Sequence, residues 1–156
     1  MTVGYVLRRG SSLDRALLVK FMERTYREIY PQQPTQHLAH TVDVHLSSQT
    51  PLWWAEPQRP EVPTSPIGCI WVGNATDQTS GARQAYVLLL YVDPDYRRRG
   101  IATALLEEAH TWAAQRGDTQ ISLQVYHDNQ PALNLYRNLG YRPTAVTLSK
   151  PLQQTQ

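Results

Sequence analysis

An unbroken apolar run followed at once by a cluster of arginines constrains this chain more than any other feature. Residues 85–92 read Ala-Tyr-Val-Leu-Leu-Leu-Tyr-Val and end at an Asp-Pro pair. A short apolar run bounded by a turn signal predicts a central strand buried on both faces. Three arginines and a glycine follow at 97–100, and a helical pattern then runs over 101–116 until Gly117 stops it. The segment therefore predicts a strand, a basic turn and a helix in direct succession.

The strand that follows this helix predicts a parallel step in the sheet. Residues 121–126 alternate apolar and polar side chains, and a strand–helix–strand crossover of this length joins parallel strands. The other predicted elements are strands at 3–8, 51–56, 67–73 and 141–148, and helices at 11–30, 35–48 and 129–139. Together they predict an α/β (α+β) fold with a mixed sheet of six to seven strands. The sheet is antiparallel in its N-terminal half, with about four helices on both faces.

Composition narrows the classes of protein and of site. The chain has 156 residues, 41% of them hydrophobic and 18% charged, which fits one globular domain over residues 1–156. The net charge of +2 is too small for a wide nucleic-acid-binding face, and no apolar run is long enough to cross a membrane. The single cysteine, Cys69, excludes an internal disulfide and is compatible with the cytoplasmic location that we expect. We expect no metal, because His37, His40 and His45 lack tightly spaced carboxylate or cysteine partners.

The basic turn before the helix has the chemistry of a phosphate site. A helix start leaves about four backbone N–H groups without internal partners and carries roughly half a positive charge. The small residues Gly100 and Ala102 let a ligand approach the backbone, and the arginines add charge. A P-loop would need a lysine here, and a dinucleotide-binding turn would need three glycines. The alternative is a plain basic surface turn without a ligand.

Two segments together resemble one known family. Residues 92–102 resemble the acyl-CoA-binding motif Arg/Gln-x-x-Gly-x-Gly/Ala of the GCN5-related N-acetyltransferases (GNAT), with Arg97, Gly100 and Ala102 at the motif positions. The second segment has Asn129, a tyrosine seven residues later (Tyr136), and a closing Leu-Gly-Tyr at 139–141, as that family commonly does. The firm resemblance covers about 85–143 and implies a GNAT fold. It also implies an acyl-CoA-binding core at 85–143 and an acceptor-side half at 1–84.

The resemblance implies a role for each matching residue. The backbone of Leu90, Tyr91 and Val92 is expected to pair with the pantetheine arm of acetyl-CoA, at a bulge and a splay between the two parallel strands. Asn129 is expected to hydrogen-bond the pantetheine region, and Tyr136 to act as general acid at the thioester sulfur. The expected pyrophosphate cradle consists of the backbone at Arg97, Arg98, Arg99, Gly100, Ile101, Ala102 and Thr103.

Each of these roles has a purely structural alternative. In the structural alternative, Asn129 serves only as a helix N-cap, for which asparagine is well suited. Tyr136 is alternatively an aromatic packed in the core. Arg98 and Arg99 are alternatively solvated, although a nucleotide 3′-phosphate would suit them. For Tyr136, full proton donation to a thiolate is uphill by about 2 kcal/mol, so we expect a hydrogen bond unless the site lowers the tyrosine pKa.

The sequence identifies the residues that bind and deprotonate the acceptor amine less clearly. Some family members carry an acidic residue where this chain has Gln124, which cannot titrate, so the general base is open. The candidates for that base are Glu23, Glu28, Glu56 and His127. The aromatic residues that either line an acceptor site or belong to the core are Tyr26, Tyr30, Trp53 and Trp54.

The implied function is an acetyl-CoA-dependent N-acetyltransferase (an acyltransferase). It moves an acetyl group to a primary amine of a small molecule or peptide by direct attack on the thioester. Acetyl-CoA is the cosubstrate, no metal takes part, and a homodimer is a further expectation by analogy. The alternative function is a non-catalytic acyl-CoA-binding sensor on the same fold. A nucleic-acid-binding module that uses the three arginines is disfavoured by the near-neutral charge.

Overall fold

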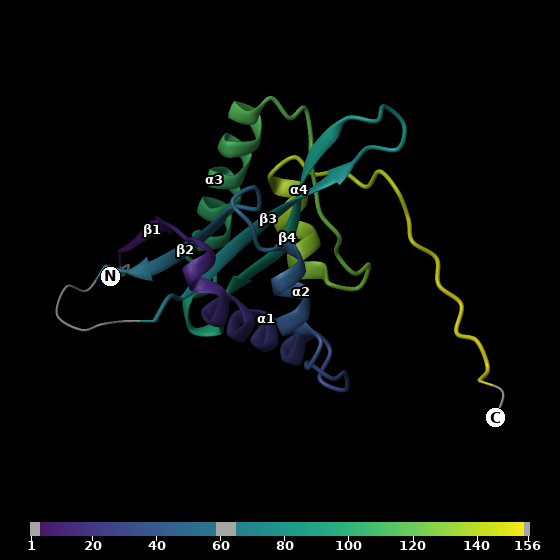
Figure 1. Ribbon diagram of the computed structural model, residues 1–156, viewed down its shortest axis with the longest axis horizontal. Coiled ribbons are helices and arrows are strands. Elements are labelled where there is room, and N and C mark those ends of the chain that lie inside the picture. Colours follow the sequence, from purple (N-terminus) through teal and green to yellow (C-terminus); the bar gives the residue numbers. More distant parts are fainter. Residues whose placement is uncertain (1–3, 59–64, 155–156) are drawn as a thin grey trace. The chain divides into compact units, whose positions relative to one another are not determined.

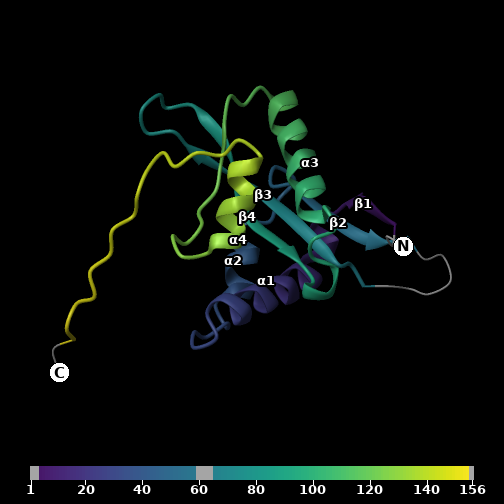
Figure 2. The same cartoon turned by 180° about the vertical axis from the view of Figure 1, so that it is seen from behind.

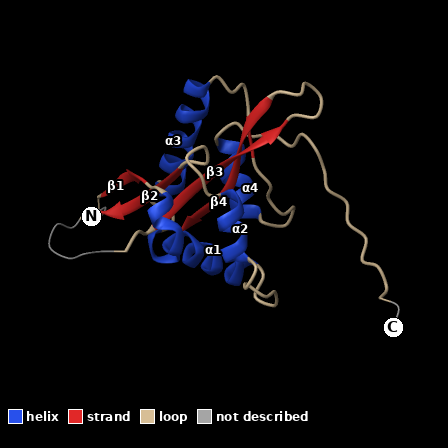
Figure 3. Cartoon of the chain, viewed as in Figure 1, coloured by secondary structure: helices blue, strands red, loops and turns tan. Residues whose placement is uncertain are grey.

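The computed structural model describes residues 4–58 and 65–154, and their strands form one mixed sheet (Figure 1). The strand order is β1-β2-β3-β4-β5, with β4 and β5 parallel. Strands β1 to β4, labelled in Figure 3, are antiparallel neighbours. The strands are β1 Tyr5–Arg9, β2 Leu52–Pro57, β3 Gly68–Thr76, β4 Arg83–Val92 and β5 Ile121–Ser122. This confirms the predicted fold class and its parallel step.

Contacts divide the chain into two compact units, residues 1–124 and 125–156. The first unit holds the whole sheet and the helices α1 (Arg15–Ile29), α2 (Leu38–His45) and α3 (Ile101–Arg116). The second unit holds α4 (Gln130–Asn138) and the segment that follows it. A single domain over 1–156, with an acceptor-side half at 1–84 and a core at 85–143, stays a prediction.

The first helical segment starts at the predicted cap. The Ser11 hydroxyl accepts a hydrogen bond from the amide of Leu13 (3.2 Å), and the Asp14 carboxylate accepts one from the amide of Ser11 (3.0 Å). This reciprocal cap opens a short 3₁₀ turn that leads into α1. The helix ends at Ile29, two residues before Pro31, which cannot continue it.

One face of the sheet forms a core with α1 and α2. The ring of Phe21 in α1 lies edge-on to Trp54 (5.1 Å between centroids) and to Tyr91 (5.7 Å). Such aromatic pairs contribute about 0.5–1.5 kcal/mol each beyond their buried area, so they hold α1 against the end of β4. The buried members of this core are Leu18, Phe21, Met22, Leu38, Val42, Leu52, Trp54, Cys69, Trp71, Leu89 and Tyr91.

Helix α3 covers the other face of the sheet (Figures 1 and 2). Its buried side chains are Ile101, Leu105, Leu106, Ala109 and Ala113. The ring of Trp112 contacts Trp53, whose side chain points away from the α1 core because neighbouring residues of a strand alternate in direction. Both faces of the sheet are therefore covered by helices, as predicted.

Strand β4 contains a bulge that changes which face its residues share. Trp71 pairs with Leu89 and Val72 pairs with Val87, so Leu88 has no partner on β3. An extra residue of this kind bends and twists the strand. Because of the bulge, Leu89 and Tyr91 join the α1 core, while Val87 follows Val72 onto the α3 face. The bulge that the family resemblance implied is therefore present in β4.

The number of strands is lower than predicted, and the strand predicted over 141–148 is wrong. That segment has no regular secondary structure, and its Val146 and Leu148 side chains are 80% and 89% exposed. A strand needs a neighbour for its backbone hydrogen bonds, but the described part of its unit contains no other strand. In addition, Pro143 has no N–H to donate.

The strand predicted over 121–126 is also shorter than expected. Only Ile121 and Ser122 pair with β4, opposite Ala85 and Tyr86. The described residues show no pairing of the two strands beyond this point, which agrees with the splay that the family resemblance implied. The described sheet therefore has five strands instead of six or seven.

Candidate active site

The splay leaves most of β4 with an open edge. Residues 87 and 89–92 pair with β3 on one side, but no described strand pairs with residues 87–92 on the β5 side. The open part begins at the bulge and ends at Val92, directly before the arginine turn. An exposed strand edge is a template on which another extended chain can add.

The alternation of the backbone identifies the groups that face this edge. The Asp93 amide donates to the Ile67 carbonyl (2.7 Å), and the Tyr91 carbonyl points to β3, 2.9 Å from the position of a Cβ on Gly68. Successive residues of a strand direct their N–H and C=O groups to opposite edges. Leu90 and Val92 therefore present theirs at the open edge, whereas the polar backbone of Tyr91 is used within the sheet. Of the three residues predicted for pantetheine pairing, Leu90 has both backbone groups at the open edge, and Val92 has its N–H there, because the Val92 carbonyl accepts a hydrogen bond from Arg97 Nε (2.9 Å).

The turn after β4 presents a run of backbone amides. Within the described residues, none of the amides from 98 to 103 donates to a backbone carbonyl. The amides of 101–103 are those of the first turn of α3, which has no internal partners for them. Arg98 (φ 62°) and Gly100 (φ 80°) both adopt the left-handed conformation. Turns of this kind gather successive N–H groups into a concave site for an anion.

Gly100 leaves the backbone of this turn accessible to a ligand. No atom lies within 4 Å of the position that its Cβ would take, so glycine is required by the backbone angle and not by lack of space. The side chains of Arg98 and Arg99 are exposed beside it, and the Arg99 guanidinium lies 5.2 Å from the centre of the Tyr96 ring. The helix start and these two guanidinium groups make the turn electropositive.

Arg97 differs from its two neighbours because its side chain is already engaged. Its Nε donates to the Val92 carbonyl (2.9 Å), and its two terminal nitrogens donate to the two carboxylate oxygens of Glu28, each at 2.7 Å. The carboxylate of Glu28 raises the pKa of the Arg97 guanidinium above its ordinary value. The sequence suggested Glu28 as a base but not as the partner of Arg97, because nothing local links residues 69 positions apart.

Taken together, these groups fit a diphosphate joined to an extended amide chain. The amides of the turn and two cations match the diphosphate, and the open backbone of Leu90 with the N–H of Val92 matches the amides of a pantetheine arm. Hydrogen bonds to a charged group contribute about 1.5–3 kcal/mol each, so a few of them suffice to hold a dianion.

A family sequence model matches this chain over residues 16–141, and that model describes the acetyltransferase (GNAT) family. The chain belongs to the acetyltransferase (GNAT) family. The match includes both segments that suggested the resemblance, and acetyl-CoA is the acetyl donor that members of the GNAT family use.

Similar proteins agree with this family assignment. An uncharacterized N-acetyltransferase of Methanocaldococcus jannaschii is 34% identical over 91 residues, which are 55% of this chain and 38% of that protein. A ribosomal-protein alanine N-acetyltransferase of Escherichia coli is 35% identical over 63 residues, which are 40% of this chain and 43% of that protein. The chain thus matches less than half the length of these two relatives.

A solved structure shows the same fold over nearly the whole chain. The aminoglycoside N-acetyltransferase AAC(6')-Iy, solved in complex with CoA, superposes with a TM-score of 0.74. The superposition covers 99% of this chain and 98% of that one, at 14% identity. At this level of identity the likeness concerns the GNAT fold alone.

In the second unit of this GNAT chain, Asn129 caps α4. Its Oδ1 accepts a hydrogen bond from the amide of Ala132 (3.3 Å), which is the structural alternative considered for this residue. Only its Nδ2 group then remains to donate to a ligand. The predicted contact between Asn129 and pantetheine stays a prediction, restricted to that donor.

Tyr136 lies on α4 with its ring 5.6 Å from that of Tyr141. Burial raises the pKa of the Tyr136 hydroxyl above its ordinary value of about 10. Burial therefore keeps the phenol protonated, which suits a hydrogen-bond donor and disfavours complete proton transfer. The role of Tyr136 as general acid stays a prediction.

The three carboxylates suggested as general base are all engaged by arginines. Glu56 pairs with Arg8, Glu28 with Arg97, and Glu23 with Arg27 at 3.6 Å. The fourth candidate, His127, is exposed in the second unit, and Gln124 is exposed just after β5. Among the four candidates, the structure therefore brings no carboxylate forward as an unpaired base.

The aromatic candidates for the acceptor side separate into two groups. Trp53 and Trp54 are buried in the sheet, so their predicted contact with an acceptor is not supported. Tyr26 and Tyr30 are half-buried at the end of α1, with ring centres 5.5 Å apart, and Tyr26 also contacts His37 (6.3 Å). This leaves Tyr26 and Tyr30 as candidates.

Three further features bear on the predicted chemistry. Cys69 is fully buried, and burial raises the pKa of its thiol, so it is not placed to act as a nucleophile. Within residues 4–58 and 65–154, no group of three or more His, Cys, Asp or Glu side chains is arranged to hold a metal ion. No helix in those ranges combines the length and apolar character needed to cross a bilayer.

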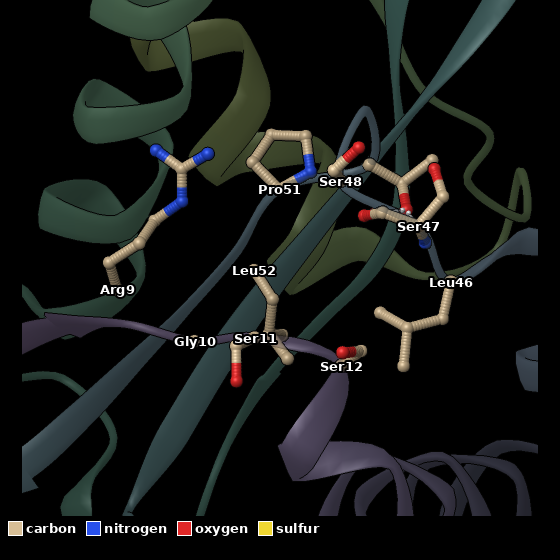
Figure 4. Close-up of a pocket in the computed structure, with 10 residues that line it drawn as sticks. Arg9, Gly10, Ser11, Ser12, Leu46, Ser47, Ser48, Pro51 and Leu52 are labelled. Carbon is tan, nitrogen blue, oxygen red and sulfur yellow. Dashed lines mark hydrogen bonds between the residues drawn. The ribbon is translucent and has the colours of Figure 1, made fainter.

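A separate pocket of about 280 Å³ lies where β1 ends and β2 begins (Figure 4). In the strand register, Leu52 lies level with Trp71 and Leu89, whereas Val92 lies level with Gly68 and Ala55. The pocket contains none of the predicted site residues. Its lining residues are Arg9, Gly10, Ser11, Ser12, Leu46, Ser47, Ser48, Thr50, Pro51 and Leu52.

Proposed function

We propose that this chain transfers the acetyl group of acetyl-CoA to a primary amine of a small molecule or peptide. The observation that carries the proposal is the open edge of β4 beside a turn whose amides, from 98 to 103, have no backbone partner among residues 4–58 and 65–154. Bound acetyl-CoA supplies a thioester carbonyl that an amine can attack directly. The N–H of Val92 lies at the open edge, where it is available to stabilise negative charge that develops on the thioester oxygen.

The paired carboxylates bear on the kind of amine that is accepted. An amine must lose its proton before it attacks. At pH 7 this costs about 1 kcal/mol for an α-amine and about 4.6 kcal/mol for a lysine side chain. Because Glu23, Glu28 and Glu56 are each held by an arginine, we propose that the amine loses its proton to water. The preferred acceptors are then weakly basic amines, such as the α-amine of a peptide.

The names of two similar proteins give two classes of amine acceptor between which an experiment must distinguish. One is named for a protein alanine and the other for aminoglycosides, which carry several basic amines. The acids of α1 and α2 are Glu23, Glu28 and Asp43, and an arginine pairs with each of them. A polycation would have to displace these arginines, so we place the aminoglycosides second.

The experiment is an acetyl-transfer assay that follows release of the free thiol. Three acceptors are compared at pH 7: a peptide with a free α-amine and no lysine, the N-blocked peptide with one lysine, and an aminoglycoside. We expect the free α-amine to react at least tenfold faster than the other two. CoA binding in calorimetry without turnover of any acceptor would instead support the acyl-CoA sensor.

A further inference from the structure

The Arg97 side chain forms a clamp between the end of β4 and the last turn of α1. Its Nε bonds the Val92 carbonyl at 2.9 Å, and its two terminal nitrogens bond both oxygens of Glu28 at 2.7 Å. A bidentate arginine–carboxylate pair fixes orientation as well as distance. With the clamp closed, the Arg97 guanidinium is committed to the protein and is not a ligand for a phosphate.

The residue after Arg97 shows what the clamp holds in place. Arg98 has φ 62°, a left-handed conformation that is uncommon for a residue other than glycine. Such a conformation is unfavourable and persists only where the surroundings fix it. The Arg97 amide contributes little to this, since its bond to the Pro94 carbonyl is long at 3.5 Å. The side-chain clamp therefore anchors the start of the turn, next to the bonds that Asp93 accepts from the amides of Asp95 and Tyr96 (2.9 Å each).

We propose that Glu28 is a positioning residue for the donor site. Through Arg97 it fixes the turn so that the amides from 98 to 103 are already aligned for a diphosphate before it binds. This inference rests on the proposed use of acetyl-CoA and adds a residue from the acceptor-side half of the chain to the donor site. Glu28 is then neither the general base nor a ligand, but the anchor of the arginine that shapes the turn.

The direction in which CoA affinity changes when Glu28 loses its charge distinguishes a positioning role from simple charge repulsion. Glu28 carries a negative charge beside the site of a diphosphate, so removing that charge should strengthen CoA binding if Coulomb repulsion alone mattered. Positioning requires the opposite result, because a neutral glutamine cannot hold the guanidinium in the same bidentate way. A general base would show a third pattern, with a loss of kcat.

The test is Glu28→Gln, with Asp43→Asn as its matched control. Asp43 also accepts a bidentate pair from an arginine, Arg15, and lies on α2 away from the turn. We expect Glu28→Gln to weaken CoA binding in calorimetry about tenfold and to raise the KM for acetyl-CoA with kcat within twofold. Asp43→Asn leaves CoA binding unchanged, and Glu28→Asp, which keeps the carboxylate, recovers part of the loss.

Two further experiments test whether the loss of CoA affinity in Glu28→Gln arises at the diphosphate. S-acetylpantetheine has the same thioester but no diphosphate, so its turnover should be the same in the wild type and in Glu28→Gln. In an Arg97→Ala background, Glu28→Gln should cause no further loss of CoA affinity, because the clamp is already absent.

The outcomes that overturn the inference are distinct from those that overturn the function. Unchanged or tighter CoA binding in Glu28→Gln, an equal loss in Asp43→Asn, or a fall in kcat alone would each remove the positioning role. A wild-type protein without CoA affinity would overturn the proposed function, and this inference with it.

Discussion

The hydroxyl of Tyr136 is the smallest unit on which the proposed reaction depends. Replacing it by Phe removes the donor while keeping the ring that packs against Tyr141. We expect Tyr136→Phe to lower kcat about 100-fold, because stabilisation of the leaving thiolate is lost, with little change in the KM for acetyl-CoA. Steady-state kinetics measure both values, and unchanged turnover would exclude Tyr136 from the mechanism.

The raised pKa of Tyr136 gives this residue a defined pH behaviour. Its folded-state pKa lies above the unfolded value of about 10, so the protonated phenol favours the folded state below that pH. The contribution is lost as the pH rises above 10. We therefore expect kcat to show no decline due to Tyr136 between pH 7 and 9. A decline in that range that is absent in Tyr136→Phe would contradict the raised pKa.

Gly100 tests the shape of the turn at the scale of one residue. It has φ 80° with open space around it, and Gly81, in the turn between β3 and β4, has φ 73° and is equally open. Substitution by Ala at either position should cost about 1 kcal/mol of stability through backbone strain alone. Only Gly100→Ala should also weaken CoA binding, because only that turn carries the amides of the site.

Urea unfolding and calorimetry separate these two effects. If both variants lose stability equally and neither loses CoA affinity, the turn at 98–103 is not the diphosphate site.

At the scale of elements, two glycines of β3 control how closely β4 approaches. A Cβ on Gly68 would lie 2.9 Å from the Tyr91 carbonyl oxygen, which is backbone and cannot move alone. A Cβ on Gly73 would meet only the end of the Leu88 side chain, at 2.7 Å, which can change its rotamer. We expect Gly68→Ala to cost about 1–3 kcal/mol in urea unfolding and Gly73→Ala clearly less. Equal costs would show that β4 tolerates displacement at the site.

The bulge shows why the elements were easier to predict than their details. The apolar run at 85–92 predicted a central strand, and the strand is there. Its sequence has no glycine or proline to mark the extra residue, so the change of face at Leu88 could not be derived from alternation. Only the family resemblance implied it. The strand predicted over 141–148 failed because alternation reports a preference, whereas a strand also requires a partner.

At the scale of the whole molecule, the proposed loss of the amine proton to water predicts a pH dependence set by the acceptor. Without a protein base, kcat/KM for the acceptor should rise about tenfold per pH unit until the pKa of the amine itself is reached. Two peptides whose α-amines differ in pKa should therefore reach their plateaus at different pH values. A plateau at one pH for both would identify a titrating group of the protein as the base.

By itself, the sequence determined the family and the order of elements as far as α4, and it predicted a phosphate site in the turn at 97–103. These depend on neighbouring residues, whose spacing fixes local conformation and chemistry. Tertiary structure alone decided that Arg97 holds Glu28, that Trp53 and Trp54 belong to the core, and that Leu90 and Val92 face the open edge. Such contacts join residues far apart in the chain, and their partners are selected by packing and strand register, which no local pattern encodes.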